Sequence, residues 1–83
     1  MLTAMNYHER IVRDQHVVGG EPIFRGTRVT LRTVLASLAE GATTAEILAD
    51  FPTLSGEDVR AAIAFVATSA QEDLPLAELP VKR

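Results

Sequence analysis

The chain has 83 residues, no cysteine, and a formal net charge of −3 from eight basic and eleven acidic residues. The length predicts one domain with one hydrophobic core. The absence of cysteine excludes disulfides, thiolate metal sites and cysteine nucleophiles, and a hydrophobic fraction of 47% argues against a chain that is disordered throughout.

Residues 1–9 are expected to be a flexible leader before a single domain over residues 10–71. The start of the chain lacks the apolar stretch of a secretory signal. The longest apolar run, residues 61–67, is much shorter than the roughly 20 residues that span a bilayer. We therefore expect a cytoplasmic protein with no membrane contact.

Residues 10–30 are expected to form short strands around two turns. Gly19-Gly20 and Gly26 mark the turns, because glycine adopts a positive φ without a steric cost. The β-prone stretches between them are short and rich in Val and Ile. They are residues 10–13, 22–24 and 28–30.

After residue 30 the apolar spacing changes to a helical period. Each expected helix starts at a capping residue: Thr30, Thr43 with Glu46 at capping-box spacing, and Ser55 with Asp58. The predicted helices cover residues of about 31–40, 44–50 and 56–70.

The sequence also predicts where the first two helices end and which face of the third helix is buried. Gly41 is expected to close the first helix, and Pro52 to end the second. The third helix is expected to bury an apolar stripe of Val59, Ala62, Ile63 and Val66, widened by Ala61 and Ala67. The fold class is mainly α, a three-helix bundle preceded by short β-strands, and its last two helices have the proportions of a helix-turn-helix.

Charge is unevenly distributed along the chain. Residues 1–32 carry five arginines and three acids, whereas residues 33–81 carry one arginine and eight acids. A polyanion would therefore bind the first third of the chain or the final Lys82-Arg83 pair. The expected DNA contacts are Arg25, Arg28, Arg32, Arg10 and Arg13.

The third helix is a poor candidate for a recognition helix. Such a helix presents Arg, Lys, Asn or Gln to base edges near its N-terminus. This one begins with Gly56, Glu57 and Asp58, and Arg60 is the only base nearby. Because the two acids repel phosphates, we expect DNA contact from the arginines of the first third instead.

No residue pattern typical of catalysis is present. His8 and His16 lack further ligands at metal-binding spacing. Ser37, Ser55 and Ser69 have no nucleophile-elbow context. We expect no enzyme activity, no cofactor and no metal site.

Residues 19–29, GGEPIFRGTRV, match the pattern G-G-x-P-x-(apolar)-(basic)-G-T-R-(aliphatic). Together with residues 38–65, this motif resembles a small bacterial and archaeal family long catalogued as a domain of unknown function and now predicted to be VapB-like antitoxins. The residues expected to shape the motif are Gly19, Gly20, Pro22, Gly26 and Thr27.

The resemblance implies a homeodomain-like helical core and a place in a type II toxin–antitoxin operon. The implied partner is a PIN-like ribonuclease toxin, similar to the VapC class, and operator DNA is a second implied partner. The implied assembly is a homodimer or a toxin–antitoxin hetero-oligomer. The alternatives are a helix-turn-helix transcriptional regulator without a toxin partner and a purely structural dimerisation module.

Residues 72–83 are expected to form an extended tail, because Pro75 and Pro80 exclude a regular helix throughout. A PIN-type active site gathers carboxylates around Mg²⁺, so a basic end on an apolar segment suits a toxin groove. A frayed terminus without a partner is the alternative. The expected toxin contacts are Leu74, Leu76, Leu79, Val81, Lys82 and Arg83.

Overall fold

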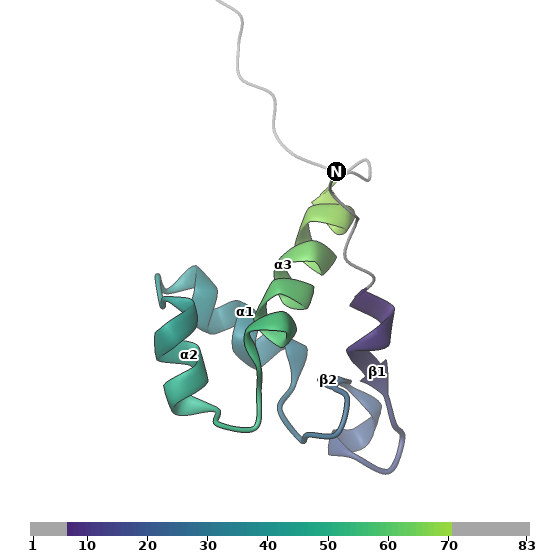
Figure 1. Ribbon diagram of the computed structural model, residues 1–83. Helices are drawn as coiled ribbons and strands as arrows, with labels where there is room; N and C mark the ends of the chain where they lie inside the picture. The colour runs from purple at the N-terminus through teal and green to yellow at the C-terminus, as the bar shows by residue number, and fades with distance from the viewer. Residues whose placement is uncertain (1–6, 71–83) are drawn as a thin grey trace, which may run out of the picture.

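The computed structural model describes residues 7–70, which form a short antiparallel strand pair followed by three helices (Figure 1). The mainly helical fold with preceding strands is therefore confirmed. The elements in chain order are the 3-10 helix η1 (Tyr7–Glu9), strand β1 (Ile11–Arg13), the 3-10 turn η2 (Val18–Gly20), strand β2 (Pro22–Phe24), and helices α1 (Leu31–Ala39), α2 (Thr44–Asp50) and α3 (Gly56–Ala70).

The helix starts lie where the capping residues predict. The Thr30 hydroxyl accepts a hydrogen bond from the Thr33 amide at 3.3 Å. Thr43 and Glu46 form a complete capping box. A bond of this kind satisfies a backbone donor that the helix leaves unpaired, and this fixes where the helix begins. Gly41, at φ +94°, follows α1 in the left-handed conformation expected of a C-terminal glycine.

Strands β1 and β2 pair in a register that places Val12 opposite Ile23 and Arg13 opposite Pro22. The third expected stretch, residues 28–30, is not a strand. It makes a single bridge, between Thr30 and Ile23. Since Thr30 also caps α1, the chain turns into the helix immediately after this bridge.

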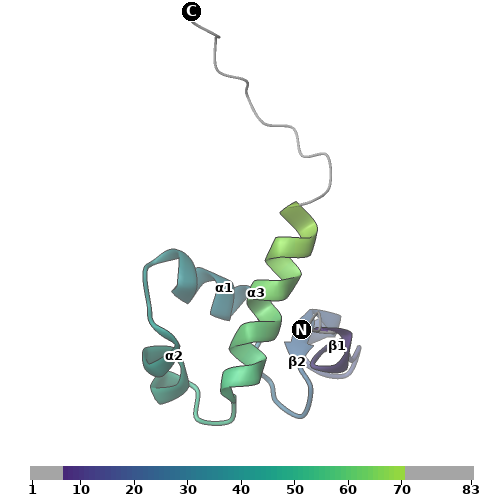
Figure 2. The same cartoon turned by 45° about the horizontal axis from the view of Figure 1, so that its top comes forward.

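One core joins the strand region to the helices. Phe24, Val34 and Ile47 are fully buried and come from β2, α1 and α2. Helix α3 packs against α1 and α2 and also against η1 and β1, so it connects both parts of the fold (Figure 2). The buried cluster is Phe24, Leu31, Val34, Ile47, Leu54, Val59 and Ala62.

The predicted apolar stripe of α3 is partly wrong. Val59, Ala61 and Ala62 are buried, but Ile63 and Val66 expose 49% and 45% of their surface. Helix α3 packs against α1 and α2 and also against η1 and β1. Asp58 and Phe65 therefore lie on its buried side, in place of Ile63 and Val66. Apolar residues surround this helix almost completely, and spacing alone therefore does not identify the buried side.

Candidate nucleic-acid interface

The most specific sequence motif forms a tight turn between β2 and α1, which we call the motif loop (residues 24–29). The Phe24 carbonyl accepts hydrogen bonds from the Thr27 amide at 2.9 Å and from the Thr27 hydroxyl at 2.8 Å. The same hydroxyl accepts from the Val29 amide at 3.0 Å. Gly26 occupies the third turn position at φ +80°, which a type II turn requires. The loop thus holds Arg25 and Arg28 on a fixed backbone.

The preceding glycine pair shapes a second turn. Val18, Gly19 and Gly20 all have positive φ values, of 48°, 63° and 83°. Left-handed backbone costs a residue with a Cβ roughly 1–2 kcal/mol, so the two glycines adopt it far more readily than Val18 does. The turn returns the chain antiparallel to β1, and the Arg13 Nη1 donates to the Gly20 carbonyl at 3.1 Å.

Two of the five expected DNA-binding arginines are paired with carboxylates. Arg32 Nε lies 3.1 Å from Glu21 Oε1. Arg10 pairs with Glu57 and, at 3.2 Å, with Asp58 Oδ1. The pair of Arg10 with Asp58 is largely sheltered from solvent, whereas Arg32 is 78% exposed, so Glu21 offsets its charge less.

The other three arginines keep their charge. Arg13 donates to the Gly20 carbonyl, and Arg25 Nε donates to the Glu9 carbonyl at 2.8 Å. A carbonyl orients a guanidinium group without neutralising it. Arg28 is exposed and makes no ion pair or hydrogen bond with any residue in the range 7–70.

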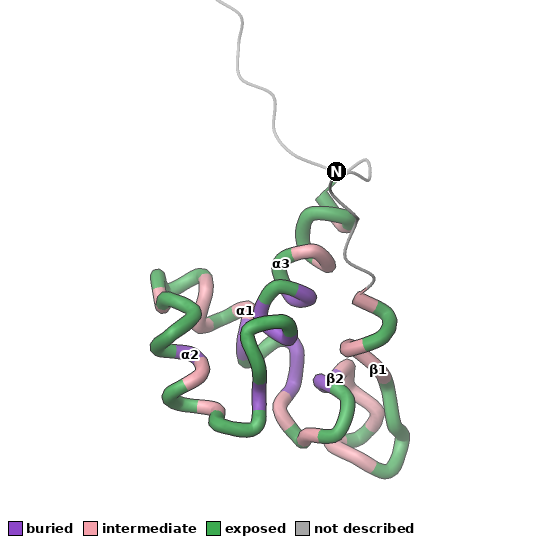
Figure 3. Tube along the Cα trace, viewed as in Figure 1, coloured by how far each residue is buried: buried purple, intermediate pink, exposed green. Residues whose placement is uncertain are grey.

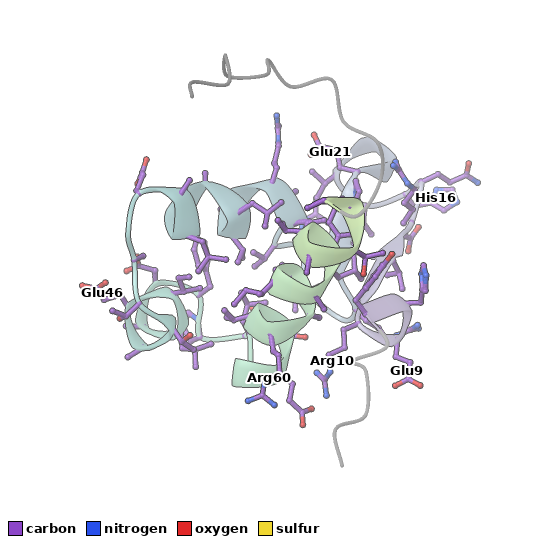
Figure 4. All side chains as sticks on the ribbon, turned by 90° about the horizontal axis from the view of Figure 1, so that it is seen from above. Glu9, Arg10, His16, Glu21, Glu46 and Arg60 are labelled. Atoms are coloured by element: carbon purple, nitrogen blue, oxygen red, sulfur yellow. The ribbon has the colours of Figure 1, made fainter. Side chains whose placement is uncertain are left out.

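Arg13, Arg25 and Arg28 border one open groove, which we call the arginine groove. Asp14 and His16 also line it, and Asp14 is the only acid that residues 7–70 contribute to the lining. The apolar part of its lining comes from Val12, Val17, Ile23 and Val29. The groove is therefore a cationic surface built mainly from the motif loop and the end of β1, and Thr53 from the segment before α3 also lines it. Figure 4 shows His16 of the groove and Arg60 of α3 at separate places on the molecule.

The start of α3 has the opposite character. Asp58 accepts hydrogen bonds from the Ser55 amide at 2.9 Å and from Arg10 Nη1 at 3.2 Å, and its side chain is only 9% exposed. Sequence reasoning identified Asp58 as a helix cap but missed Arg10 as its partner. The two residues are 48 positions apart, and no local pattern indicates such a pairing.

Residues 7–70 contain no candidate metal site and no membrane-spanning helix. In that range no three His, Asp or Glu side chains lie close enough together to hold a metal ion. No helix there is long and apolar enough to cross a membrane. The six expected toxin contacts, Leu74, Leu76, Leu79, Val81, Lys82 and Arg83, lie outside the described residues.

Comparison with known proteins identifies the family. The model of the family described as "Protein of unknown function (DUF433)" matches residues 11–66, so this chain belongs to the DUF433 family. The crystal structure of a DUF433 member protein from Anabaena variabilis is similar, with 31% sequence identity and a TM-score of 0.66 over 77% of this chain. This chain covers 63% of that protein's length. No curated protein matches the chain.

Proposed function

We propose that this protein is an antitoxin of a type II toxin–antitoxin system, which binds DNA through the arginine groove and neutralises a PIN-like ribonuclease toxin. One observation carries the DNA-binding part of the proposal. Three exposed arginines, none of them paired with a carboxylate of residues 7–70, line one groove at the motif loop of a chain that is acidic overall.

The groove suits a phosphate backbone. Contacts between arginine and phosphate supply most of the sequence-independent affinity for DNA, because they release condensed counterions. Arg13 and Arg25 are held by backbone carbonyls, so binding needs little additional ordering of their side chains. Among the described residues that line the groove, Asp14 is the only one whose negative charge would repel a phosphate.

In this proposal the three helices form a homeodomain-like core that supports the motif loop. Helices α2 and α3 are joined by a short segment, residues 51–55, and both pack on the core shared with α1. The acids at the start of α3 argue against insertion of that end into the major groove. DNA is therefore expected to dock on the motif loop, with α3 acting as a support.

Titration with salt tests this docking. The chain should bind the duplex from its own promoter at low ionic strength, without any toxin. Three phosphate contacts, at about 0.9 each, predict a slope of about −2.7 in a plot of log affinity against log salt. Absence of binding at low salt, or a slope near zero, would contradict the proposal.

The toxin-binding part rests on the apolar and basic composition of the tail. We propose that Leu74, Leu76, Leu79 and Val81 contact the toxin and that Lys82 or Arg83 meets its carboxylates. A chain that lacks residues 72–83 should lose affinity for the PIN-like protein encoded next to its gene. Unchanged affinity would reject the tail as the toxin contact.

A transcriptional regulator without a toxin is the second candidate. The short connection between α2 and α3 favours it, because many DNA-binding helix pairs share that arrangement. A regulator would bind its promoter with the same salt dependence, but no toxin gene would adjoin its own. The neighbouring open reading frame therefore separates the two candidates.

A further inference from the structure

Helix α3 exposes an apolar stripe that the groove does not use. Ile63 and Val66 are the large apolar side chains that residues 7–70 leave exposed, at 49% and 45%. Ala67 and Ala70 are exposed as well. The four residues stand at i, i+3, i+4 and i+7, so they share one face of the helix. We call this face the α3 stripe.

The stripe lies outside the core. Val59 and Ala62 of α3 are buried against the other elements, whereas the last turns of α3 extend beyond α1 and α2 (Figures 1 and 2). In Figure 3 most of the tube along these turns has the colour of exposed residues. A contiguous exposed apolar face on a folded domain marks a contact with a partner.

We infer that the α3 stripe binds the α3 stripe of a second copy of this chain, with the two helices antiparallel. The spacing is symmetric about the point between Val66 and Ala67. In an antiparallel pair Ile63 therefore lies beside the partner's Ala70, and the central residues meet near the two-fold axis. A large side chain beside a small one lets two helices approach closely, and one face serves both copies, as a two-fold interface requires.

Charge favours the antiparallel direction. Arg60 precedes Ile63 by one turn, is exposed, and makes no ion pair with another described residue. The sequence after Ala70 continues with Gln71, Glu72 and Asp73. An antiparallel pair brings Arg60 of each helix to the end where the partner's chain becomes acidic. A parallel pair would place the two Arg60 side chains together, where they repel each other.

The expected dimer is weak. Four small or medium apolar residues on each copy bury less than the roughly 1,200–2,000 Å² of a standard interface. We expect a dissociation constant of about micromolar or above, and a dimer fraction that rises with concentration. The inference does not depend on DNA or toxin binding, so it can fail without affecting those proposals.

Sedimentation velocity over a wide concentration range tests the stripe. The wild-type chain should move from monomer to dimer as concentration rises. Ile63→Asp places a charge in the contact between the two copies. It should weaken dimerisation at least tenfold and so keep the chain monomeric. Thr68→Asp is the matched control, because Thr68 is exposed on another side of α3 and should leave the dimer intact. Circular dichroism checks that both variants remain folded.

Crosslinking tests the direction, since the natural chain has no cysteine. A mixture of Ile63→Cys and Ala70→Cys chains should form disulfide-linked heterodimers faster than either variant links to itself. Preferred linkage of Ile63→Cys to itself would indicate a parallel pair and overturn the proposed direction.

Other occupants of the stripe give different results. A wild-type chain that stays monomeric at every concentration would overturn the inference. If Ile63→Asp then raised hydrogen exchange in the C-terminal residues, the stripe would be covered by its own chain. If it abolished toxin binding, the stripe would belong to the toxin interface, and the dimer would again be rejected.

Discussion

The motif loop and the start of α3 are the two places where this fold could meet DNA, and they differ in how their charges are partnered. Arg25 of the loop and Arg13 of β1 each donate to a backbone carbonyl, and Arg28 has no carboxylate partner in residues 7–70, so the groove remains cationic. Glu57 and Asp58 of α3 form ion pairs with Arg10, which offset part of their negative charge. These side chains therefore stabilise the fold at that end of the helix. The usable charge of a segment therefore depends on its tertiary partners as well as on its composition.

Arg10 shows this dependence most clearly. It belongs to the basic first third of the sequence, yet its guanidinium group serves the acidic helical part. Arg32 is similarly occupied by Glu21. Of the five arginines that composition offers to a polyanion, two are thus paired with carboxylates in the fold. The following predictions test the two regions, from the largest expected effect to the smallest.

Phe24 joins the motif loop to the helical core, and it is fully buried. Phe24→Ala should lower the free energy of unfolding by about 3–5 kcal/mol, through lost burial and a cavity. Chemical denaturation measures this loss. Phe51→Ala is the matched control, because Phe51 is only half-buried and should cost clearly less. Equal losses would show that the motif is not a central part of the core.

Asp58 stabilises the start of α3 as both a cap and an ion-pair partner. Asp58→Ala should cost about 2–3 kcal/mol, since it removes a helix cap and the sheltered carboxylate that pairs with Arg10. Thermal unfolding should show a clear decrease in Tm. Asp50→Ala, at an exposed acid of α2, should change stability by less than about 0.5 kcal/mol. A decrease of the same size for both would argue against the Arg10 contact.

Gly26 tests the backbone of the motif loop. A Cβ at this position meets no atom within 4 Å, so the cost of Gly26→Ala comes from its φ of +80° alone. We expect about 1–2 kcal/mol of destabilisation. Gly56→Ala should change the free energy of unfolding in the opposite direction. Gly56 starts α3 with open space around it and no positive φ, so alanine should stabilise the chain slightly. A neutral or stabilising effect of Gly26→Ala would contradict the left-handed turn geometry.

The local parts of this structure could be predicted from the sequence. The capping pairs and glycine positions fix helix ends through contacts within a few residues, and Thr43 with Glu46 is one example. The sequence could not show that residues 28–30 fail to form a third strand. They fail because Thr30, which bridges to Ile23, also caps α1, so the chain enters the helix there. That conflict appears only when the strands and the helix meet.

The candidate site was predictable only in part. The motif predicted a turn at Gly26, and the structure shows Arg25 and Arg28 exposed in and beside that turn. The pairing of Arg10 with Asp58 depends on contacts across 48 residues, and the exposure of Ile63 depends on which elements reach α3. Neither is encoded in a local pattern, so both needed the three-dimensional arrangement.

The central claim is that DNA docks on the motif loop rather than on α3. Two matched substitutions test it most directly: Arg28→Gln and Arg60→Gln each remove one exposed arginine that has no ion-pair partner in residues 7–70. Fluorescence anisotropy with promoter DNA, repeated at increasing salt, gives the slope of affinity for each variant. Arg28→Gln should reduce the slope by about 1, and Arg60→Gln should leave it unchanged. The reverse result would place the DNA on α3 and contradict the claim.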